Sequence, residues 1–149
     1  MKLEGFNTID FGTSREGVVY VFFVATETEE IPFYVGETDR FQGRMDDYVR
    51  TQFAAPTDFK VGEAVRYLRD AKKYRVIVKY KVTANRSTEE ARIIQGLHSE
   101  GKRLLNDLPD YEYRTGSKEE RAEKISRAQE IVQRFCDSLT GKQLDPASA

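Results

Sequence analysis

The sequence predicts an α+β fold: a small three-stranded mixed α/β sheet surrounded by helices, with a long helix near the C-terminus. Residues 17–24 and 31–36 are rich in β-branched and aromatic side chains and are separated by a short acidic segment, so we expect them to pair as an antiparallel hairpin. A third strand is expected at 74–83, where valine and tyrosine alternate with mostly basic residues. Other apolar residues recur at helical spacing, as in 61–68, and predict helices around this sheet.

Length and composition indicate one domain with a well-solvated surface, because the chain has 149 residues of which 33% are charged. No apolar run approaches the length of a membrane span, and the first residues lack the apolar core of a signal peptide, so we expect a cytoplasmic protein without a membrane partner. Cys136 is the only cysteine and His98 the only histidine, which excludes an internal disulfide and a Cys/His metal cluster. We expect His98 on the surface or in a loop.

Two tyrosines and an arginine are predicted to meet near the hairpin. Because side chains alternate across a strand, Tyr20 and Tyr34 are expected on one surface of the sheet. Gly36 is expected to end the second strand, and a helix capped by Asp39 follows it. On that helix Arg44 and Tyr48 are four residues apart and are expected to point along the tyrosine surface.

Glu90 is the carboxylate of greatest interest in the second half of the chain. It lies in a predicted helix with Ser87 as its N-cap, on the same face as Ile94 and Leu97. An unpaired carboxylate on an inward face is costly, so it usually has a partner or a metal. The competing interpretation is a capping box, in which Glu90 folds back onto the Ser87 amide.

The tripeptides Val-Val-Tyr at 18–20 and Tyr-Val-Gly at 34–36, followed by Arg44, Tyr48 and Glu90, resemble the GIY-YIG nuclease family. The family's metal-binding glutamate precedes two apolar residues three and four positions on, which selects Glu90 over Glu89. The resemblance also implies that Asn106 ties the active-site elements together.

This resemblance implies hydrolysis of DNA phosphodiester bonds with one divalent cation, Mg²⁺ or Mn²⁺, held by Glu90. Arg44 would bind the scissile phosphate through its forked cationic head. Tyr20 would relay or accept a proton from the attacking water, and Tyr34 and Tyr48 would position the phosphate and the water.

The sequence departs from the family at two points. The first tripeptide lacks Gly and Ile, and Glu37 follows the second tripeptide, where some relatives carry a basic residue. A carboxylate there repels phosphate unless a cation or a basic neighbour offsets its charge, or unless it points away.

Four regions are expected along the chain. They are an N-terminal irregular arm (1–16), a GIY-YIG-like nuclease domain (17–107), a helical extension packed on that domain (108–141) and a disordered tail (142–149). The extension contains a helix predicted at 118–139, with a capping box at its start and Gly141 as its terminator. Its apolar stripe is expected to pack on the domain, the alternative being that it binds a protein partner.

Basic side chains are concentrated in residues 60–86, where Glu63 and Asp70 are the only acidic residues. The predicted nucleic-acid contacts are Lys72, Lys73, Lys79 and Lys81. Removing charge from them is expected to lower DNA affinity and to flatten its salt dependence, unless these lysines are only solvated surface. Two hypotheses follow: a metal-dependent DNA endonuclease, or a catalytically weak or inactive GIY-YIG-like module that binds nucleic acid or a protein.

Overall fold

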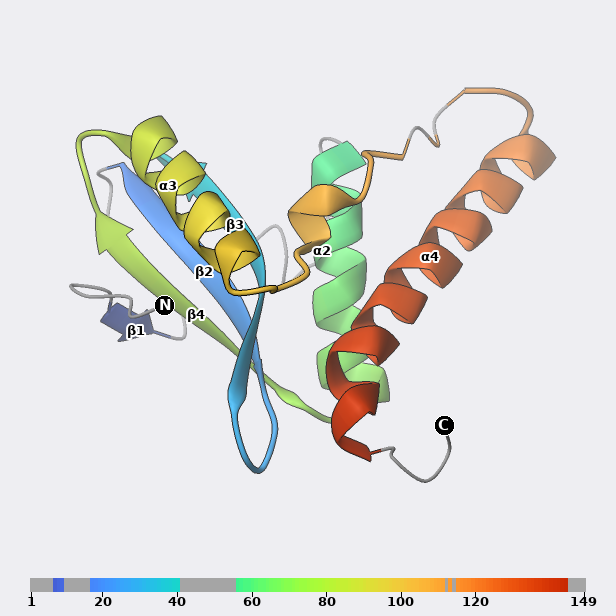
Figure 1. The fold of residues 1–149 in the computed structure, drawn as a ribbon. Helices are drawn as coiled ribbons and strands as arrows, with labels where there is room; N and C mark the ends of the chain where they lie inside the picture. The colour runs from blue at the N-terminus through green and yellow to red at the C-terminus, as the bar shows by residue number, and fades with distance from the viewer. Residues whose placement is uncertain (1–6, 10–16, 41–55, 112, 114, 145–149) are drawn as a thin grey trace.

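A computed structural model describes residues 7–9, 17–40, 56–111, 113 and 115–144. The described strands form one sheet in the order β1-β4-β2-β3, with helices on both faces (Figure 1). The strands are β1 (Asn7–Ile9), β2 (Val18–Ala25), β3 (Glu30–Thr38) and β4 (Arg75–Val82). The helical elements are α2 (Pro56–Arg66), the π-helical turn η1 (Tyr67–Ala71), α3 (Arg86–Ser99), the 3₁₀ turn η2 (Leu105–Asp107) and α4 (Lys118–Leu144).

The predicted α+β class, the antiparallel hairpin, the joining strand and the long C-terminal helix are confirmed. All described strand pairs are antiparallel, so the prediction of a mixed sheet is wrong. The reason is that η1 delivers the chain to the hairpin end of the sheet, where Arg75 pairs with Ala25, and β4 therefore runs opposite to β2. Within the expected N-terminal arm, Asn7–Ile9 form a short strand that covers the outer edge of β4.

A β-bulge shapes the hairpin. The register shifts between Phe22 and Phe23, so that Phe22 is opposite Tyr34 and Phe23 is opposite Pro32. Phe33 is the extra residue, and both Phe33 and Tyr34 join the same apolar cluster. Pro32 has no N–H to donate, which suits its place on an edge strand.

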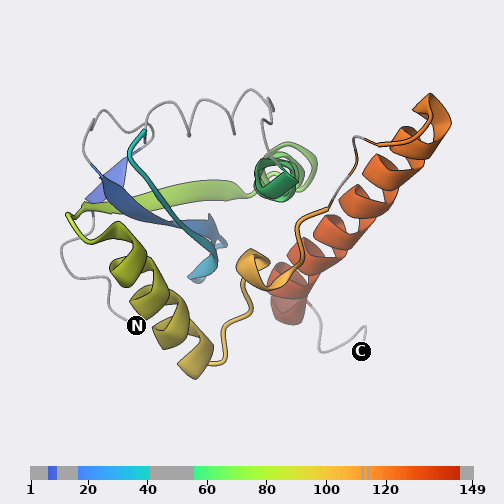
Figure 2. The same ribbon diagram turned by 90° about the horizontal axis from the view of Figure 1, so that it is seen from above.

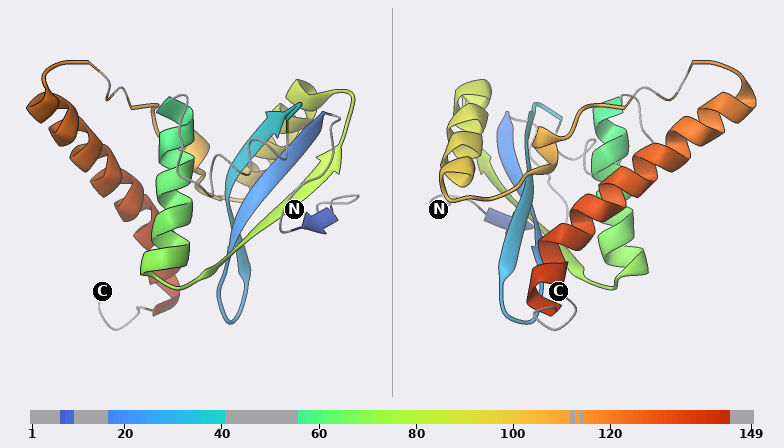
Figure 3. Two further views of the ribbon diagram at one scale, coloured as in Figure 1. Left: turned by 180° about the vertical axis from the view of Figure 1, so that it is seen from behind. Right: turned by 45° about the vertical axis from the view of Figure 1, so that its right-hand side comes forward.

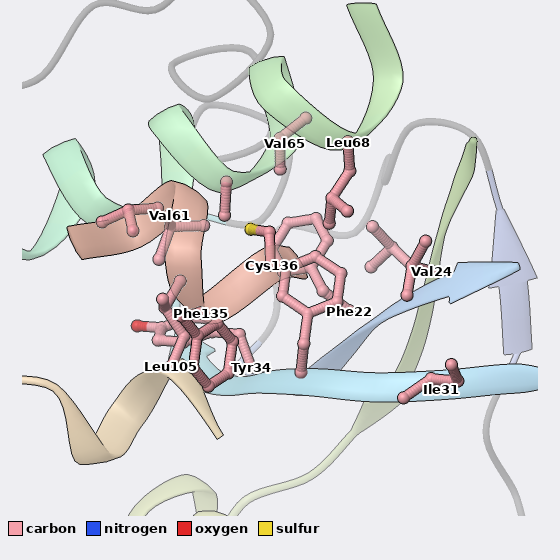
Figure 4. Packing of buried hydrophobic residues seen from close by; sticks show 14 of the residues in the cluster. Phe22, Val24, Ile31, Tyr34, Val61, Val65, Leu68, Leu105, Phe135 and Cys136 are labelled. Atoms are coloured by element: carbon pink, nitrogen blue, oxygen red, sulfur yellow. The ribbon is translucent and has the colours of Figure 1, made fainter. Parts of the chain in front are cut away.

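The two faces of the sheet are covered by different helices (Figures 1 and 2). On one face α2 and α4 bury a large, partly aromatic cluster (Figure 4) that includes Tyr20, Phe22, Phe33, Tyr34, Leu68, Leu105, Phe135 and Cys136. On the other face α3 buries a smaller, mostly aliphatic cluster that includes Val19, Val21, Val35, Ile93, Leu97 and Leu104. We call these the α2/α4 face and the α3 face.

The predicted apolar stripe of α4 packs on the domain through Ala128, Val132 and Phe135, while the N-terminal turns of the helix extend away from the sheet (Figure 3). The expected capping box is present, because the Ser117 and Glu120 side chains each accept a hydrogen bond from the other's backbone N–H. The helix does not stop at Gly141 but runs to Leu144. One glycine costs a helix only about 1 kcal/mol relative to alanine, so Gly141 does not have to end it.

Within the described ranges, none of the helices combines the length and the apolar character needed to cross a lipid bilayer.

Candidate functional site

Tyr20 and Tyr34 lie on the same face of the sheet, as the alternation predicts. Their ring centroids are 6.3 Å apart, and both side chains are buried, with relative exposures of 2% and 7%. Phe22 contacts both rings, with centroid distances of 5.7 Å and 6.2 Å. These ring contacts and the burial fix the orientation of the two tyrosines.

Gly36 is opposite Tyr20 and makes room for its ring. A Cβ at Gly36 would lie 2.4 Å from both Cζ and Oη of Tyr20, closer than real contacts allow. Gly36 does not end the strand as expected, because β3 continues its pairing with β2 as far as Thr38. The glycine therefore serves close cross-strand approach rather than chain termination.

Arg44 and Tyr48 fall in residues 41–55, outside the described part of the chain. Their place beside the tyrosines stays a prediction.

Asn106, in η2, binds the backbone of β3 through both ends of its side-chain amide. Val35 N–H donates to Asn106 Oδ1 at 2.9 Å, and Asn106 Nδ2 donates to the Val35 carbonyl at 2.7 Å. β3 is an edge strand of the described sheet, so its outer backbone groups need partners other than a strand. Asn106 supplies them and thereby ties η2 to the segment that carries Tyr34 and Gly36.

Glu90 is partly buried near the start of α3. Burial raises the pKa of its carboxyl group, and the nearby charge of Glu37 raises it further. Among the described residues, no hydrogen bond or ion pair reaches this carboxylate. The proposed capping box is absent: the N-cap is Asn85 and Ser87 lies inside the first turn, because α3 begins at Arg86.

Glu37 lies on the α3 face, where its strand partner Val19 packs with Ile93 and Leu97. It therefore points away from Tyr20 and Tyr34. Arg86 offsets its charge, since Arg86 Nη1 is 3.0 Å from Glu37 Oε2. Glu37 is thus paired with a basic neighbour and directed away from the tyrosines, the two circumstances under which a phosphate bound beside the tyrosines tolerates it.

The predicted site residues form two groups in the described structure. Tyr20 and Tyr34 lie on the α2/α4 face and Asn106 binds the backbone of β3 beside Tyr34, whereas Glu90 lies toward the α3 face, where Glu37 of β3 also lies. The structure therefore does not bring the tyrosine rings and Glu90 together on one side of the sheet. The expected convergence of Tyr20, Tyr34 and Glu90 on one solvent-reachable concavity is therefore not seen among the described residues, whereas the places of Arg44 and Tyr48 stay predictions.

The four predicted DNA-contacting lysines do not share one surface. Lys72 lies over the Tyr67 ring at 5.4 Å, with its Nζ 3.9 Å from the Asp137 carboxylate of α4. Lys73 follows it with a positive φ of 61°. Lys79 and Lys81 are on the α3 face of β4, where Lys79 Nζ is 2.8 Å from Glu30 Oε1 and 4.9 Å from the Phe23 ring centroid. A DNA molecule that contacts all four lysines would therefore have to pass from one side of the sheet to the other.

Two buried charged residues escaped the sequence interpretation. Glu63 accepts hydrogen bonds from Arg66, Gln129 and Gln133. Lys60 donates to the Leu108 carbonyl at 2.6 Å and pairs with Asp110 at 3.1 Å. Their partners are in the chain itself, so both act in the packing of α2 rather than in a ligand site. The sign of this burial in the sequence is that both residues lie among the apolar residues of α2.

Glu90 is the carboxylate that a cation would find here, because Glu37 is already paired with Arg86. The described residues contain no group of three or more His, Cys, Asp or Glu side chains placed to hold a metal. Mg²⁺ keeps several waters and binds proteins through one or two carboxylates, so such a small donor set suits it. A partly buried carboxylate without a partner in the described chain is compatible with this ligand role.

Comparisons of the chain with protein-family models, with curated proteins and with solved structures give no match.

Proposed function

We propose that the protein is an endonuclease that hydrolyses DNA phosphodiester bonds with one divalent cation, Mg²⁺ or Mn²⁺. The observation that carries this proposal is the Glu90 carboxylate, which is partly buried beside Glu37 and has no bonded partner among the described residues. A carboxylate in this state is destabilising until a cation offsets its charge, and residues with perturbed pKa values are enriched in functional sites.

Several features of the chain support a nuclease of the GIY-YIG type. The Tyr20 hydroxyl lies over Gly36, and Asn106 holds Val35 between Tyr34 and Gly36. In the proposal Arg44 binds the scissile phosphate and Tyr20 relays or accepts a proton, while Glu90 would hold the cation, which would supply charge neutralisation and water activation. An unperturbed tyrosine has a pKa of about 10, so Tyr20 requires a nearby positive charge to act as a base near neutrality.

One observation favours the alternative, a catalytically weak or inactive module that binds nucleic acid or a protein partner. Tyr20 and Tyr34 are almost completely buried, and their rings lie on the opposite face of the sheet from α3, which carries Glu90. A general base must reach the proton that it removes. If residues 41–55 do not open a path to these hydroxyls, the fold retains binding without hydrolysis.

The deciding experiment is metal-dependent nicking of DNA. Supercoiled, branched and single-stranded DNA would be incubated with the purified protein in Mg²⁺, Mn²⁺ or EDTA, together with Arg44→Ala, Glu90→Ala and the neighbouring control Glu89→Ala. We expect cleavage with metal, none with EDTA, a loss of about 100-fold or more in the first two variants, and little change in the control. Equal trace nicking by the wild type, Arg44→Ala and Glu90→Ala would refute the nuclease proposal. Metal-independent DNA binding without cleavage would support the alternative.

The proposal includes a cytoplasmic location and DNA as the substrate. Binding of a protein partner to α4 is a secondary prediction, because the apolar stripe of α4 already packs on the domain.

A further inference from the structure

Arg86 lies across the backbone at the start of β2. A Cβ on Gly17 would be 2.6 Å from Arg86 Cδ and 2.9 Å from Arg86 Nε, so the side chain fits there only because residue 17 is glycine. The Thr83 N–H donates to the Gly17 carbonyl at 3.0 Å and holds the chain leading into α3 against the same place. The aliphatic stem of Arg86 is therefore seated directly on the main chain.

The guanidinium of Arg86 is held at its other end by Glu37. Arg86 Nη1 is 3.0 Å from Glu37 Oε2, and the arginine side chain keeps a relative exposure of 35%. Glu37 is its sole hydrogen-bond or ion-pair partner among the described residues. A guanidinium has five N–H donors, so most of them remain available to a ligand.

The position of Arg86 relative to Glu90 links it to the candidate site. The two residues are four apart in α3 and lie one above the other on the same side of the helix. The charge of Glu37 acts on Glu90 and pairs with Arg86, so the three side chains form one local group.

We propose that Arg86 is a phosphate-binding residue for DNA, seated on Gly17 and oriented by Glu37; this inference rests on the nuclease function proposed above. The planar fork of a guanidinium binds phosphate oxygens through paired N–H groups. Glu37 orients the fork, but it also competes with phosphate for it and repels the backbone of DNA. The two members of this ion pair therefore act on DNA affinity in opposite directions.

The opposite effects of Arg86 and Glu37 on DNA affinity distinguish a phosphate contact from a purely structural ion pair. The dissociation constant of a fluorescent DNA duplex would be measured by anisotropy in EDTA, over a series of salt concentrations, so that the readout does not depend on catalysis. We expect Arg86→Gln to weaken binding about tenfold at low salt and to reduce the slope of log K against log salt by about 0.9. Glu37→Gln is expected to strengthen binding. A purely structural ion pair would give changes of the same sign, because either substitution breaks it.

The chain offers a matched control pair in the same helix. Arg92 Nη2 is 2.7 Å from Glu89 Oε2, so Arg92→Gln and Glu89→Gln remove the same charges from a second Glu–Arg ion pair. We expect both control variants to change affinity less than their counterparts at Arg86 and Glu37. Arg86→Lys keeps the charge and is expected to recover part of the affinity, and thermal unfolding verifies that every variant is folded.

The two measurements distinguish a failure of the Arg86 proposal from a failure of the nuclease proposal. If the wild type binds and nicks DNA but Arg86→Gln matches Arg92→Gln, the role of Arg86 is refuted and the nuclease function stands. The role is refuted equally if Arg86→Gln and Glu37→Gln shift the affinity in the same direction. A wild-type protein that neither binds nor nicks DNA overturns the nuclease function and this inference with it.

Discussion

Glu63 and Glu90 are two carboxylates withdrawn from water on opposite sides of the sheet, and their surroundings differ completely. Glu63, only 4% exposed, receives two hydrogen bonds from Arg66 and one each from Gln129 and Gln133. Glu90 is less deeply buried, yet no hydrogen bond or ion pair reaches it in the described part of the chain. Burial alone therefore does not mark a functional carboxylate. The number of partners that the chain itself provides separates the two cases.

The partners of Glu63 show what it does. Arg66 comes from the same helix, but both glutamines come from α4, so the network joins α2 to α4. These bonds specify the angular position of α4 on the domain, which apolar contacts alone leave less defined. Four hydrogen bonds from this chain satisfy the Glu63 carboxylate, so its role is structural.

The largest effect is expected at Glu63. Glu63→Ala leaves the two glutamine amides and the Arg66 guanidinium without their buried acceptor at the partly buried contact between α2 and α4, and we expect a loss of about 3 kcal/mol in the free energy of unfolding. Urea unfolding followed by circular dichroism measures it. The control is Glu130→Ala in α4, which breaks the exposed Glu130–Arg134 pair and should cost no more than about 0.5 kcal/mol. Equal losses in the two variants would mean that the Glu63 network contributes nothing beyond a surface ion pair.

Local patterns accounted for much of the fold. Continuous β-branched and aromatic runs placed β2 and β3, and the alternation of valine and tyrosine with mostly basic residues placed β4, because composition and periodicity are properties of each segment alone. The bulge at Phe33 and the pairing of β1 with β4 depend on which strands meet, and no single segment encodes that information. The extension of α4 beyond Gly141 was missed because one glycine costs a helix only about 1 kcal/mol and does not have to end it.

The sequence predicted those features of the candidate site that follow from residue spacing along one helix or strand, since this spacing determines where a side chain points. Helical spacing predicted that Glu90 points inward, and family resemblance selected Asn106, which binds β3. Spacing did not reveal that Tyr20 and Glu90 belong to different faces, because that depends on which side of the sheet α3 covers. The contacts of Arg86 with Gly17 and Glu37 join three separate segments and were equally hidden.

An intermediate effect is expected at Asn106, a polar side chain near the candidate site whose amide oxygen and nitrogen are both bonded to β3. Asn106→Ala removes both bonds to Val35 and leaves an edge-strand N–H and C=O without these partners, so we expect a loss of about 2 kcal/mol in the free energy of unfolding. Amide hydrogen exchange should show faster exchange at Val35. Asn85→Ala is the control, because Asn85 is the N-cap of α3 but makes no side-chain capping bond. Unchanged exchange at Val35 would show that Asn106 does not hold β3 in solution.

The smallest effect, and the sharpest test of the contrast with Glu63, is the pH dependence contributed by Glu90. Its pKa in the folded protein is raised, first by burial and then by Glu37, so folding favours the protonated form. The resulting penalty on stability is present above the folded pKa and disappears as the pH falls below the unfolded value of about 4.3. Glu90→Gln should therefore make the metal-free protein slightly more stable than the wild type at pH 7, and the advantage should shrink on acidification.

Glu89, the adjacent residue, provides a control of opposite sign. Its pKa is lowered, chiefly by the hydrogen bond from Arg92, so its contribution stabilises the fold above the unfolded pKa and is lost as the pH falls through the folded value. Glu89→Gln should thus slightly reduce stability at pH 7, where Glu90→Gln increases it. Urea midpoints measured in EDTA between pH 4 and pH 8 compare the two variants directly. A loss of stability in both at neutral pH would mean that Glu90 has a stabilising partner in the chain, and its carboxylate would then belong with Glu63 rather than with a metal.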